Sequence, residues 1–329
     1  MHAYLPADPD VWSIGTFRWP PGDRGSGLAK AGWVRRLPGE PSVDALLADW
    51  GTASERLAAW AVDAGAEWVD QTDLVPLAPW TPGQVLQAGA NYRKHVVDII
   101  VSERADDTQG RSEEEKRAYG EALMARRAAE GDPYVFLGTA GAMTGATGDI
   151  ELTVRPEAKD DWELELGVVL GRGGRFVDVA DAMDLVAGYT VVNDITSRDL
   201  VYRPDLPKIG TDWLAAKNAP TFLPTGPVIV PAEFVPDPTA LRVVLAHNGV
   251  VRQDESVSDM IFGIPRLIAY ASTLLRLAPG DLLLTGSPAG NGAHYGISLS
   301  PGDLLVGEIT GLGRQRNRCV AVGMPVGRA

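Results

Sequence analysis

Residues 160–172 read D-D-W-E-L-E-L-G-V-V-L-G-R, an acidic cluster that runs directly into a hydrophobic stretch. Side chains alternate along a strand, so Glu163 and Glu165 project from one face while Leu164 and Leu166 occupy the other. Two neighbouring carboxylates raise each other's pKa unless a cation lies between them. The stretch therefore predicts a strand of a β-rich core. Its glutamates either lie exposed at a sheet edge or bind a hard divalent cation, which prefers oxygen ligands.

Short aliphatic runs bounded by Gly, Pro, Asn or Asp continue through the rest of the chain and are typical of strands and turns. The clearest are G-Y-T-V-V-N-D-I, G-P-V-I-V, A-L-R-V-V-L-A-H-N-G-V-V-R, D-L-L-L-T-G and D-L-L-V-G-E-I-T. The 37 glycines and 24 prolines suit such a chain of short strands better than a helical bundle. We predict a mainly β fold with some α.

The N-terminal part is expected to fold separately. Residues 1–78 contain short strand-like pieces and helical patterns, and predict a small α+β domain. The proline-rich stretch L-V-P-L-A-P-W-T-P-G at 74–83 marks the boundary. Residues 79–329 form the catalytic domain in this interpretation, because the clustered titratable residues all follow the boundary.

Three helices are predicted with some precision. One covers 53–64 and begins at a cap provided by Thr52 or Ser54. A second, polar helix covers 112–130, with a serine cap, acids in its first turn, arginines in its last and a terminal glycine. A third, at about 259–275, is apolar around much of its circumference and is expected to be packed.

The charge of the chain limits its partners. With 30 basic and 43 acidic residues the net charge is −13, which argues against nucleic acid or an anionic membrane surface. Cys319 is the only cysteine, so neither a disulfide framework nor a thiolate metal site is expected. The N-terminal residues lack a secretory pattern, and no apolar run approaches a membrane span. We expect a cytoplasmic protein.

A third carboxylate strengthens the cation hypothesis. Asp194 ends the apolar run G-Y-T-V-V-N-D-I, where a neighbouring strand could bring it beside the two glutamates. Three carboxylates leave coordination positions open for water or substrate, as a catalytic Mg²⁺ site requires. Alternatively, Asp194 is a turn residue or a helix cap.

Seven motifs in a fixed order resemble the fumarylacetoacetate hydrolase superfamily, in particular its acylpyruvase-like branch. They are N-Y-R-K-H (91–95), D-W-E-L-E-L-G-V-V-L-G (161–171), V-V-N-D-I-T-S-R-D-L (191–200), K-N-A-P-T-F-L-P-T-G-P (217–227), N-G-V-V-R-Q (248–253), D-M-I-F (259–262) and P-G-D-L-L-L-T-G-S-P-A-G-N-G (279–292). Each motif is weak alone, but the ordered set is specific. The resemblance covers roughly residues 80–322.

The resemblance implies a mixed β-sandwich roll that forms a homodimer. It also implies a Mg²⁺ or Mn²⁺ ion held by Glu163, Glu165 and Asp194. A cation would explain why the glutamates are tolerated in a buried strand.

The resemblance further identifies His95 as the catalytic histidine, with Asp98 as its acidic partner. The spacing is one helical turn, so the carboxylate could orient the imidazole and help it to take a proton from water. A structural histidine is the alternative.

The remaining assignments concern the substrate. Lys217 matches a catalytic lysine of the family and Arg198 an arginine near the metal, so both are expected to pair with substrate oxygens. Salt bridges with acidic neighbours are the alternative for both. Tyr92, in the N-Y-R-K-H motif, and Ser287, where the family usually has threonine, are assigned to substrate binding. The G-S-P-A-G context of Ser287 does not fit a serine-hydrolase elbow.

Several positions depart from the family pattern. F-L-G replaces F-L-K, so Gly138 stands where members have a lysine. Val201 replaces a glutamine, K-N-A-P-T-F replaces K-S-F-D-T-F, and a helical insertion at about 99–133 occupies the segment that acts as a lid. These departures leave the metal ligands intact and concern the substrate.

Three functions are open at this point. The first is metal-dependent hydrolysis of a C–C bond in a 1,3-dicarbonyl acid such as an acylpyruvate or fumarylpyruvate, with His95 activating water. The second uses the same site without hydrolytic water, for decarboxylation, tautomerisation, hydration or isomerisation of a keto acid such as oxaloacetate. The third is a non-catalytic binding protein on the same scaffold.

Overall fold

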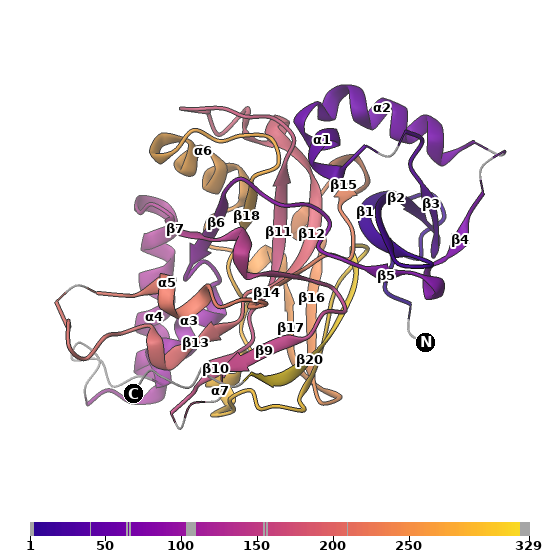
Figure 1. Cartoon of the computed structure of the whole chain (residues 1–329). Helices are drawn as coiled ribbons and strands as arrows, with labels where there is room; N and C mark the ends of the chain where they lie inside the picture. The colour runs from indigo at the N-terminus through magenta and orange to yellow at the C-terminus, as the bar shows by residue number, and fades with distance from the viewer. Residues whose placement is uncertain are drawn as a thin grey trace.

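Two β-sheets stacked against each other form the centre of the protein, and a smaller N-terminal sheet lies to one side (Figure 1). The computed structural model describes residues 3–322, apart from residues 40, 64, 66, 103–109, 154, 156 and 209. The arrangement confirms the prediction of a mainly β fold with some α.

The larger sheet carries the strand with which the sequence analysis began. In spatial order it contains β7 (Tyr134–Gly138), β6 (Val85–Gly89), β18 (Leu282–Leu284), β11 (Leu164–Leu170), β12 (Val186–Asn193), β14 (Leu223–Thr225) and β8 (Met143–Gly145), and β15 (Val230–Pro231) pairs with β12. The central strand β11 runs antiparallel to both β12 and β18. Every residue of β11 is buried. The alternative in which the two glutamates lie exposed at a sheet edge is therefore wrong.

The second sheet is built from two hairpins and one added strand. Its order is β17 (Val250–Ser256), β16 (Arg242–His247), β19 (Leu304–Ile309), β20 (Gly313–Val322) and β9 (Ile150–Thr153). Asn248 and Gly249 connect β16 to β17 with positive φ angles of 51° and 82°. Asn-Gly is the preferred pair for such a two-residue hairpin turn.

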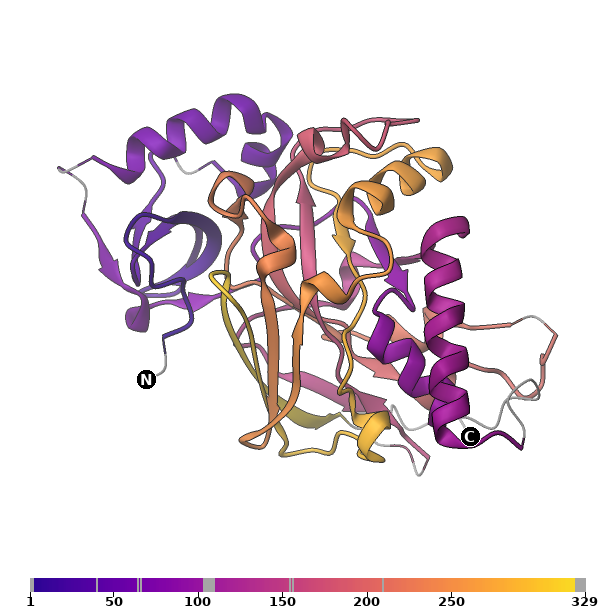
Figure 2. The ribbon, with the colours of Figure 1, turned by 180° about the vertical axis from the view of Figure 1, so that it is seen from behind.

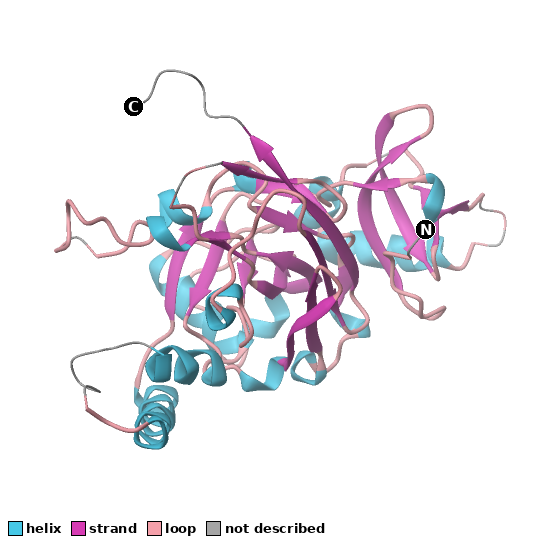
Figure 3. Cartoon of the chain, turned by 90° about the horizontal axis from the view of Figure 1, so that it is seen from below, coloured by secondary structure: helices cyan, strands magenta, loops and turns pink. Residues whose placement is uncertain are grey.

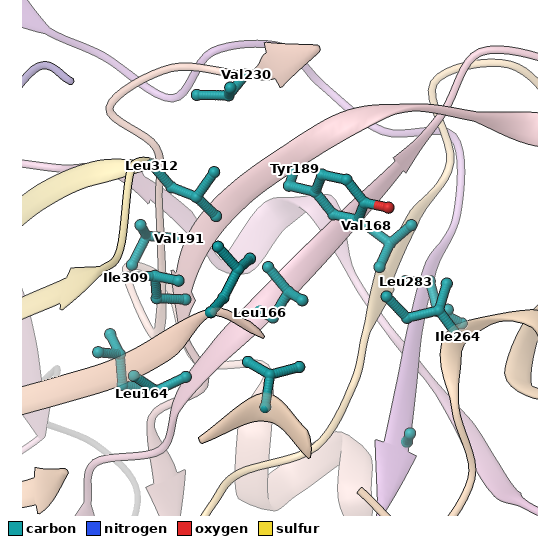
Figure 4. Packing of buried hydrophobic residues seen from close by; sticks show 14 of the residues in the cluster. Leu164, Leu166, Val168, Tyr189, Val191, Val230, Ile264, Leu283, Ile309 and Leu312 are labelled. Carbon is teal, nitrogen blue, oxygen red and sulfur yellow. The ribbon is translucent and has the colours of Figure 1, made fainter. Parts of the chain in front are cut away.

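The alternation along β11 separates core from site. Its even-numbered residues, Leu164 and Leu166 among them, pack with Val191, Ile309 and Leu312 between the two sheets (Figure 4). Gly307 of β19 approaches so closely that an added Cβ would lie 2.5 Å from Leu164 Cδ1. The odd-numbered residues face the other way, where Glu163 and Glu165 lie.

The N-terminal residues form their own sheet, which packs on the larger one (Figure 2). Its order is β4 (Val69–Asp70), β3 (Trp33–Arg36), β2 (Asp23–Lys30), β1 (Trp12–Trp19) and β5 (Val75–Pro76). Leu28 of this sheet and Leu57 share a core cluster with Val169 of β11. The division into domains 1–78 and 79–329 stays a prediction.

Helices pack around the sheets (Figure 3). They are α1 (Val43–Ala48), α2 (Trp50–Ala61), α3 (Arg93–Ser102), α4 (Glu113–Glu130), α5 (Trp213–Lys217), α6 (Ile264–Leu274) and α7 (Gly292–Tyr295). The predicted polar helix is confirmed as α4, and it packs on α3. The insertion predicted at about 99–133 lies partly outside the described residues, at 103–109.

Two predicted helix starts are wrong. α2 begins at Trp50, after the N-cap residue Asp49, and not at Thr52 or Ser54. α6 begins at Ile264, because Gly263 caps it and Pro265 suits its first turn.

Shorter elements complete the fold. β10 (Asp160–Asp161) pairs with β13 (Thr196–Ser197), and 3₁₀ helices occur at Gln71–Asp73, Ala140–Ala142, Ala182–Leu185, Arg198–Leu200, Ala232–Phe234, Pro238–Ala240 and Val257–Asp259. None of the helices in the described residues is both long enough and apolar enough to span a membrane.

Candidate active site

Strands β11 and β12 bring three acidic side chains together. Leu164 pairs with Asn193 in the ladder, and the Asp194 N–H donates to the Glu163 carbonyl oxygen at 2.8 Å. One carboxylate oxygen from each of Glu163, Glu165 and Asp194 lies within 4.8 Å of the others. The three residues are at most 6% exposed. The predicted ligand set is therefore assembled in the fold.

Two cations lie against this cluster. Lys217, at the end of α5, donates from Nζ to Glu163 Oε2 and to Thr196 Oγ1, both at 2.7 Å, and to Asp194. Arg198 donates to the other oxygen of Glu163 and, at 3.0 Å, to Asp161 Oδ2. Lys217 and Arg198 thus form the ion pairs with acidic neighbours that were the alternative for both, and their contacts with substrate oxygens stay a prediction.

The charges of the cluster do not balance. If all are ionised, four carboxylates (Asp161, Glu163, Glu165 and Asp194) face two cations, and two negative charges remain. Burial disfavours ionisation of Glu163, but Arg198 and Lys217 outweigh it and lower its pKa to about 2. Burial, with Asp194 and Glu163 adding to it, raises the pKa of Glu165 well above its usual value. Burial also raises the pKa of Asp194 to about 6, despite Lys217.

A divalent cation fits this donor set. The cluster offers only carboxylate oxygens, which Mg²⁺ and Mn²⁺ accept as ligands. Its surplus of two negative charges equals the charge of one such ion. The ion pairs of the described residues include none to Glu165, and its raised pKa marks it as a carboxylate without a compensating charge. Glu163, Glu165 and Asp194 could therefore hold a divalent metal.

A glycine fixes the orientation of Glu165. Gly286, just after β18, donates its N–H to Glu165 Oε2 at 2.7 Å. Its φ of 95° belongs to the left-handed region, and an added Cβ would lie 3.0 Å from the Ala88 carbonyl oxygen. Glycine at this position therefore lets the backbone approach the site.

A small cavity lies beside the acidic cluster. Its volume is about 160 Å³, and its lining comprises His95, Asp98, Ile99, Arg198, Gly290, Asn291, Ala293 and His294. Burial lowers the pKa of His95 to about 4, so its imidazole is neutral at physiological pH. A larger hollow of about 470 Å³ lies elsewhere, between Tyr4 and Arg314, and its described lining includes no acidic residue.

Asp98 makes other contacts than the sequence suggested. It lines the same cavity as His95, but Arg117 of α4 donates to Asp98 Oδ1 at 3.3 Å. His294 Nδ1 lies 3.8 Å from Asp98 Oδ2. The hydrogen bonds of the described residues include none between His95 and Asp98, so the expected pair is not formed here.

Two of the three residues assigned to substrate binding, Tyr92 and Ser287, are packed inside the protein. Tyr92 is fully buried, and its hydroxyl lies 3.4 Å from Thr285 Oγ1. Ser287 is 6% exposed, accepts from Gln253 at 3.1 Å and donates to the Pro288 carbonyl. Neither residue is among those that line the cavity.

Three site residues were not identified from the sequence. Asp161 accepts from the Gly292 and Ala293 N–H groups and so ties α7 to Arg198. His294 stands on α7 at the cavity. Gln87 of β6 donates to Asp194 Oδ1 at 2.9 Å. Asp161 lies in the quoted acidic stretch, which was a usable signal, whereas no local pattern marks His294 or Gln87.

Comparison with known proteins shows the family of the chain. The sequence profile described as fumarylacetoacetate (FAA) hydrolase C-terminal matches residues 84–320. A mitochondrial oxaloacetate tautomerase from Bos taurus is 37% identical over 192 residues, which are 57% of this chain and 59% of that protein. The 4-hydroxyphenylacetate degradation bifunctional isomerase/decarboxylase from Escherichia coli is 41% identical over 195 residues, 58% of this chain and 42% of that protein.

A solved structure extends the likeness to the whole fold. The 5-carboxymethyl-2-hydroxymuconate delta-isomerase from Mycobacterium smegmatis is 25% identical, with a TM-score of 0.67, and the match covers 95% of this chain and all of that one. The match to the two curated relatives spans only about half of their length. The predicted sandwich roll is thereby confirmed, and the chain belongs to the fumarylacetoacetate hydrolase family.

Proposed function

We propose that the chain is a divalent-metal-dependent enzyme that forms an enolate from a small keto acid and interconverts its keto and enol forms or decarboxylates it. The observation that carries this proposal is the arrangement at the cavity. A neutral His95 and Arg198 line it beside the buried triad, while Asp98 is held by Arg117. Enolisation requires a proton acceptor and an electrophile but no oriented water.

Each group has a role in this proposal. A Mg²⁺ or Mn²⁺ ion held by Glu163, Glu165 and Asp194 would supply Lewis acidity toward the oxygens of the keto acid. In keto–enol conversion, the neutral imidazole of His95 takes the proton from the carbon beside the keto group, and the resulting imidazolium gives it to the enolate oxygen. In decarboxylation, the carboxylate leaves as CO₂, the electron pair of the broken bond becomes the enolate, and the enolate carbon takes a proton from water. Arg198 and Lys217 hold one oxygen each of Glu163 and so fix its direction.

The relatives support this reaction class. One is named an oxaloacetate tautomerase and the other a bifunctional isomerase/decarboxylase, and neither name describes hydrolysis. Oxaloacetate is therefore the first substrate to test, and we expect the substrate to be a small keto acid or dicarbonyl acid.

Hydrolysis of a 1,3-dicarbonyl acid is the second candidate. Asp98 and His95 lie one helical turn apart on α3 and line the same cavity. If the Asp98 side chain turned away from Arg117, its carboxylate could orient the His95 imidazole. Acylpyruvates and fumarylpyruvate remain the substrates predicted for this reaction.

Replacement of Asp98 separates the two candidates. With Mg²⁺ present, we expect the parent to accelerate the keto–enol conversion or the loss of oxaloacetate. Both are measured by the change in absorbance of oxaloacetate. Asp98→Asn should change kcat by less than about threefold if His95 acts alone, but by about 100-fold or more in a hydrolase that needs the pair. Asp254→Asn is the matched control, because Asp254 pairs with Arg242 on the surface.

Three results would contradict the proposal. They are cleavage of acylpyruvates into two acids by the parent, loss of that activity in Asp98→Asn, and no effect of the parent on oxaloacetate.

A further inference from the structure

Gln87 is a buried polar residue in contact with the acidic cluster. It lies on β6, opposite Phe136 of β7, and is 2% exposed. Its Nε2 donates to Asp194 Oδ1 at 2.9 Å, while Lys217 donates to Asp194 Oδ2. Each carboxylate oxygen of Asp194 therefore accepts a hydrogen bond from a different partner. One partner is a cation and the other a neutral amide.

The other end of the Gln87 amide is not satisfied. Within the part of the chain that the structure describes, Gln87 Oε1 has no hydrogen-bond partner, although it is buried. A buried acceptor without a partner costs free energy, so a residue that only filled the core would be better apolar. The polarity of Gln87 is consequently explained by the carboxylate that it contacts.

Gly138 provides the space for this side chain. An added Cβ at Gly138 would lie 3.1 Å from Gln87 Cδ and Oε1 and 3.2 Å from Nε2, closer than ordinary contact. The absence of a side chain at Gly138 thus leaves the room that the amide of Gln87 needs.

We propose that Gln87 is a positioning residue for the metal site, which orients Asp194 through its amide N–H, and that Gly138 is required because it leaves room for Gln87. The inference rests on the metal site of the proposed function. A partner that orients a metal ligand commonly contributes to metal affinity, although it does not touch the ion.

The test is Mn²⁺ binding by the full chain, measured by calorimetry, without any substrate. Gln87→Met keeps the length of the side chain but removes its N–H donor. We expect its Kd for Mn²⁺ to rise at least about tenfold. Its thermal midpoint without metal should stay close to that of the parent, because the hydrogen bond to Asp194 is lost but an unpaired buried acceptor is removed as well.

A double-mutant cycle tests the role of Gly138. Gly138→Ala should weaken Mn²⁺ binding in the parent, because the methyl group displaces Gln87. It should have little further effect in Gln87→Met, whose flexible thioether can adapt and has no hydrogen bond to lose. Additive effects of the two substitutions would overturn the proposed link between these positions.

The outcomes are distinguishable. If the parent binds Mn²⁺ and Gln87→Met binds it equally well, the positioning role is wrong and the proposed function is unaffected. A lower thermal midpoint with unchanged Kd would show a purely structural role. If the parent binds no Mn²⁺, the proposed function and this inference both fail.

Discussion

At the scale of single residues, Lys217 is a buried cation that pairs with two carboxylates of the metal-free cluster. It is 4% exposed and contacts Glu163 and Asp194. These acidic groups raise its pKa despite burial, so its ammonium group stays charged. A buried ion pair is strongly destabilising to break, because the remaining charges lose their partner.

We therefore expect Lys217→Met to lower the free energy of unfolding of the metal-free protein by about 3–5 kcal/mol, measured by urea denaturation at pH 7. Saturating Mn²⁺ should restore part of the loss, since the ion supplies positive charge to the same carboxylates. Lys94→Met is the control, because Lys94 pairs with Glu255 on the surface. An unchanged urea midpoint would contradict the electrostatic account of the cluster.

The residues predicted from sequence were those with local signals. Glu163 and Glu165 are two apart on one strand, and Asp194 directly follows another, so their direction followed from strand geometry. The contact between Gln87 and Asp194 joins positions 107 residues apart, and that between Asp161 and Gly292 joins positions 131 apart. Such contacts depend on the order of strands in the sheet, which no local pattern encodes.

At the scale of elements, the 3₁₀ helix Arg198–Leu200 presents Arg198 to the site, and Asp199 holds it in place. Burial disfavours ionisation of Asp199, but the hydrogen bonds from Arg155 and the Lys159 N–H outweigh it and lower its pKa. A lowered carboxyl pKa adds stability above the unfolded value of about 3.9, and the stability is lost as the pH falls through the folded value.

Asp199→Asn should accordingly reduce the free energy of unfolding by about 2 kcal/mol at pH 7, where the charged hydrogen bonds are intact in the parent. The difference between parent and variant should shrink as the pH falls below about 3.9. Urea denaturation over a pH series measures both. A difference independent of pH would show that the charge of Asp199 is not the cause.

Element boundaries were predictable only where capping was unambiguous. The Ser112–Glu115 capping box begins α4 as expected, because both of its hydrogen bonds are local. For α2 the sequence offered several possible caps, and the structure has Asp49 at the N-cap position. Thr52 lies inside the helix and donates its hydroxyl to the Asp49 carboxylate.

At the scale of the whole molecule, dimer formation stays a prediction. β7 ends the larger sheet, and Leu137 on it is 54% exposed. Leu214, on the neighbouring helix α5, is 69% exposed. Apolar side chains beside an open strand edge are typical of an interface.

We expect the parent to elute as a dimer in size-exclusion chromatography with light scattering, and Leu137→Glu with Leu214→Glu to elute as a monomer. An unpaired charge is costly to bury in an apolar interface, so the two substitutions should prevent association. Val250→Glu, on an exposed hairpin strand far along the chain, is the control. A dimer that survives the double substitution would place the interface elsewhere.

Composition and motif order predicted the β-rich class of the fold but not the pairing of its strands. The β content followed from the short aliphatic runs, whereas the eight-residue strands β1 and β2 appeared in the sequence only as broken pieces. Glycines interrupt both strands, and their pairing is set by the hairpin and by Ile229, far along the chain. Long-range pairing of this kind overrides weak local propensity.

The central claim is that the buried triad binds a divalent cation, and Glu165→Gln tests it most directly. Titration of Mn²⁺ into both proteins should show about one ion per parent chain and an affinity lower by at least about tenfold in the variant. Because the raised pKa of Glu165 means that its ionised form destabilises the fold, the metal-free variant should be at least as stable as the parent at pH 7. Equal Mn²⁺ affinity in the two proteins, or no binding by the parent, would contradict the claim.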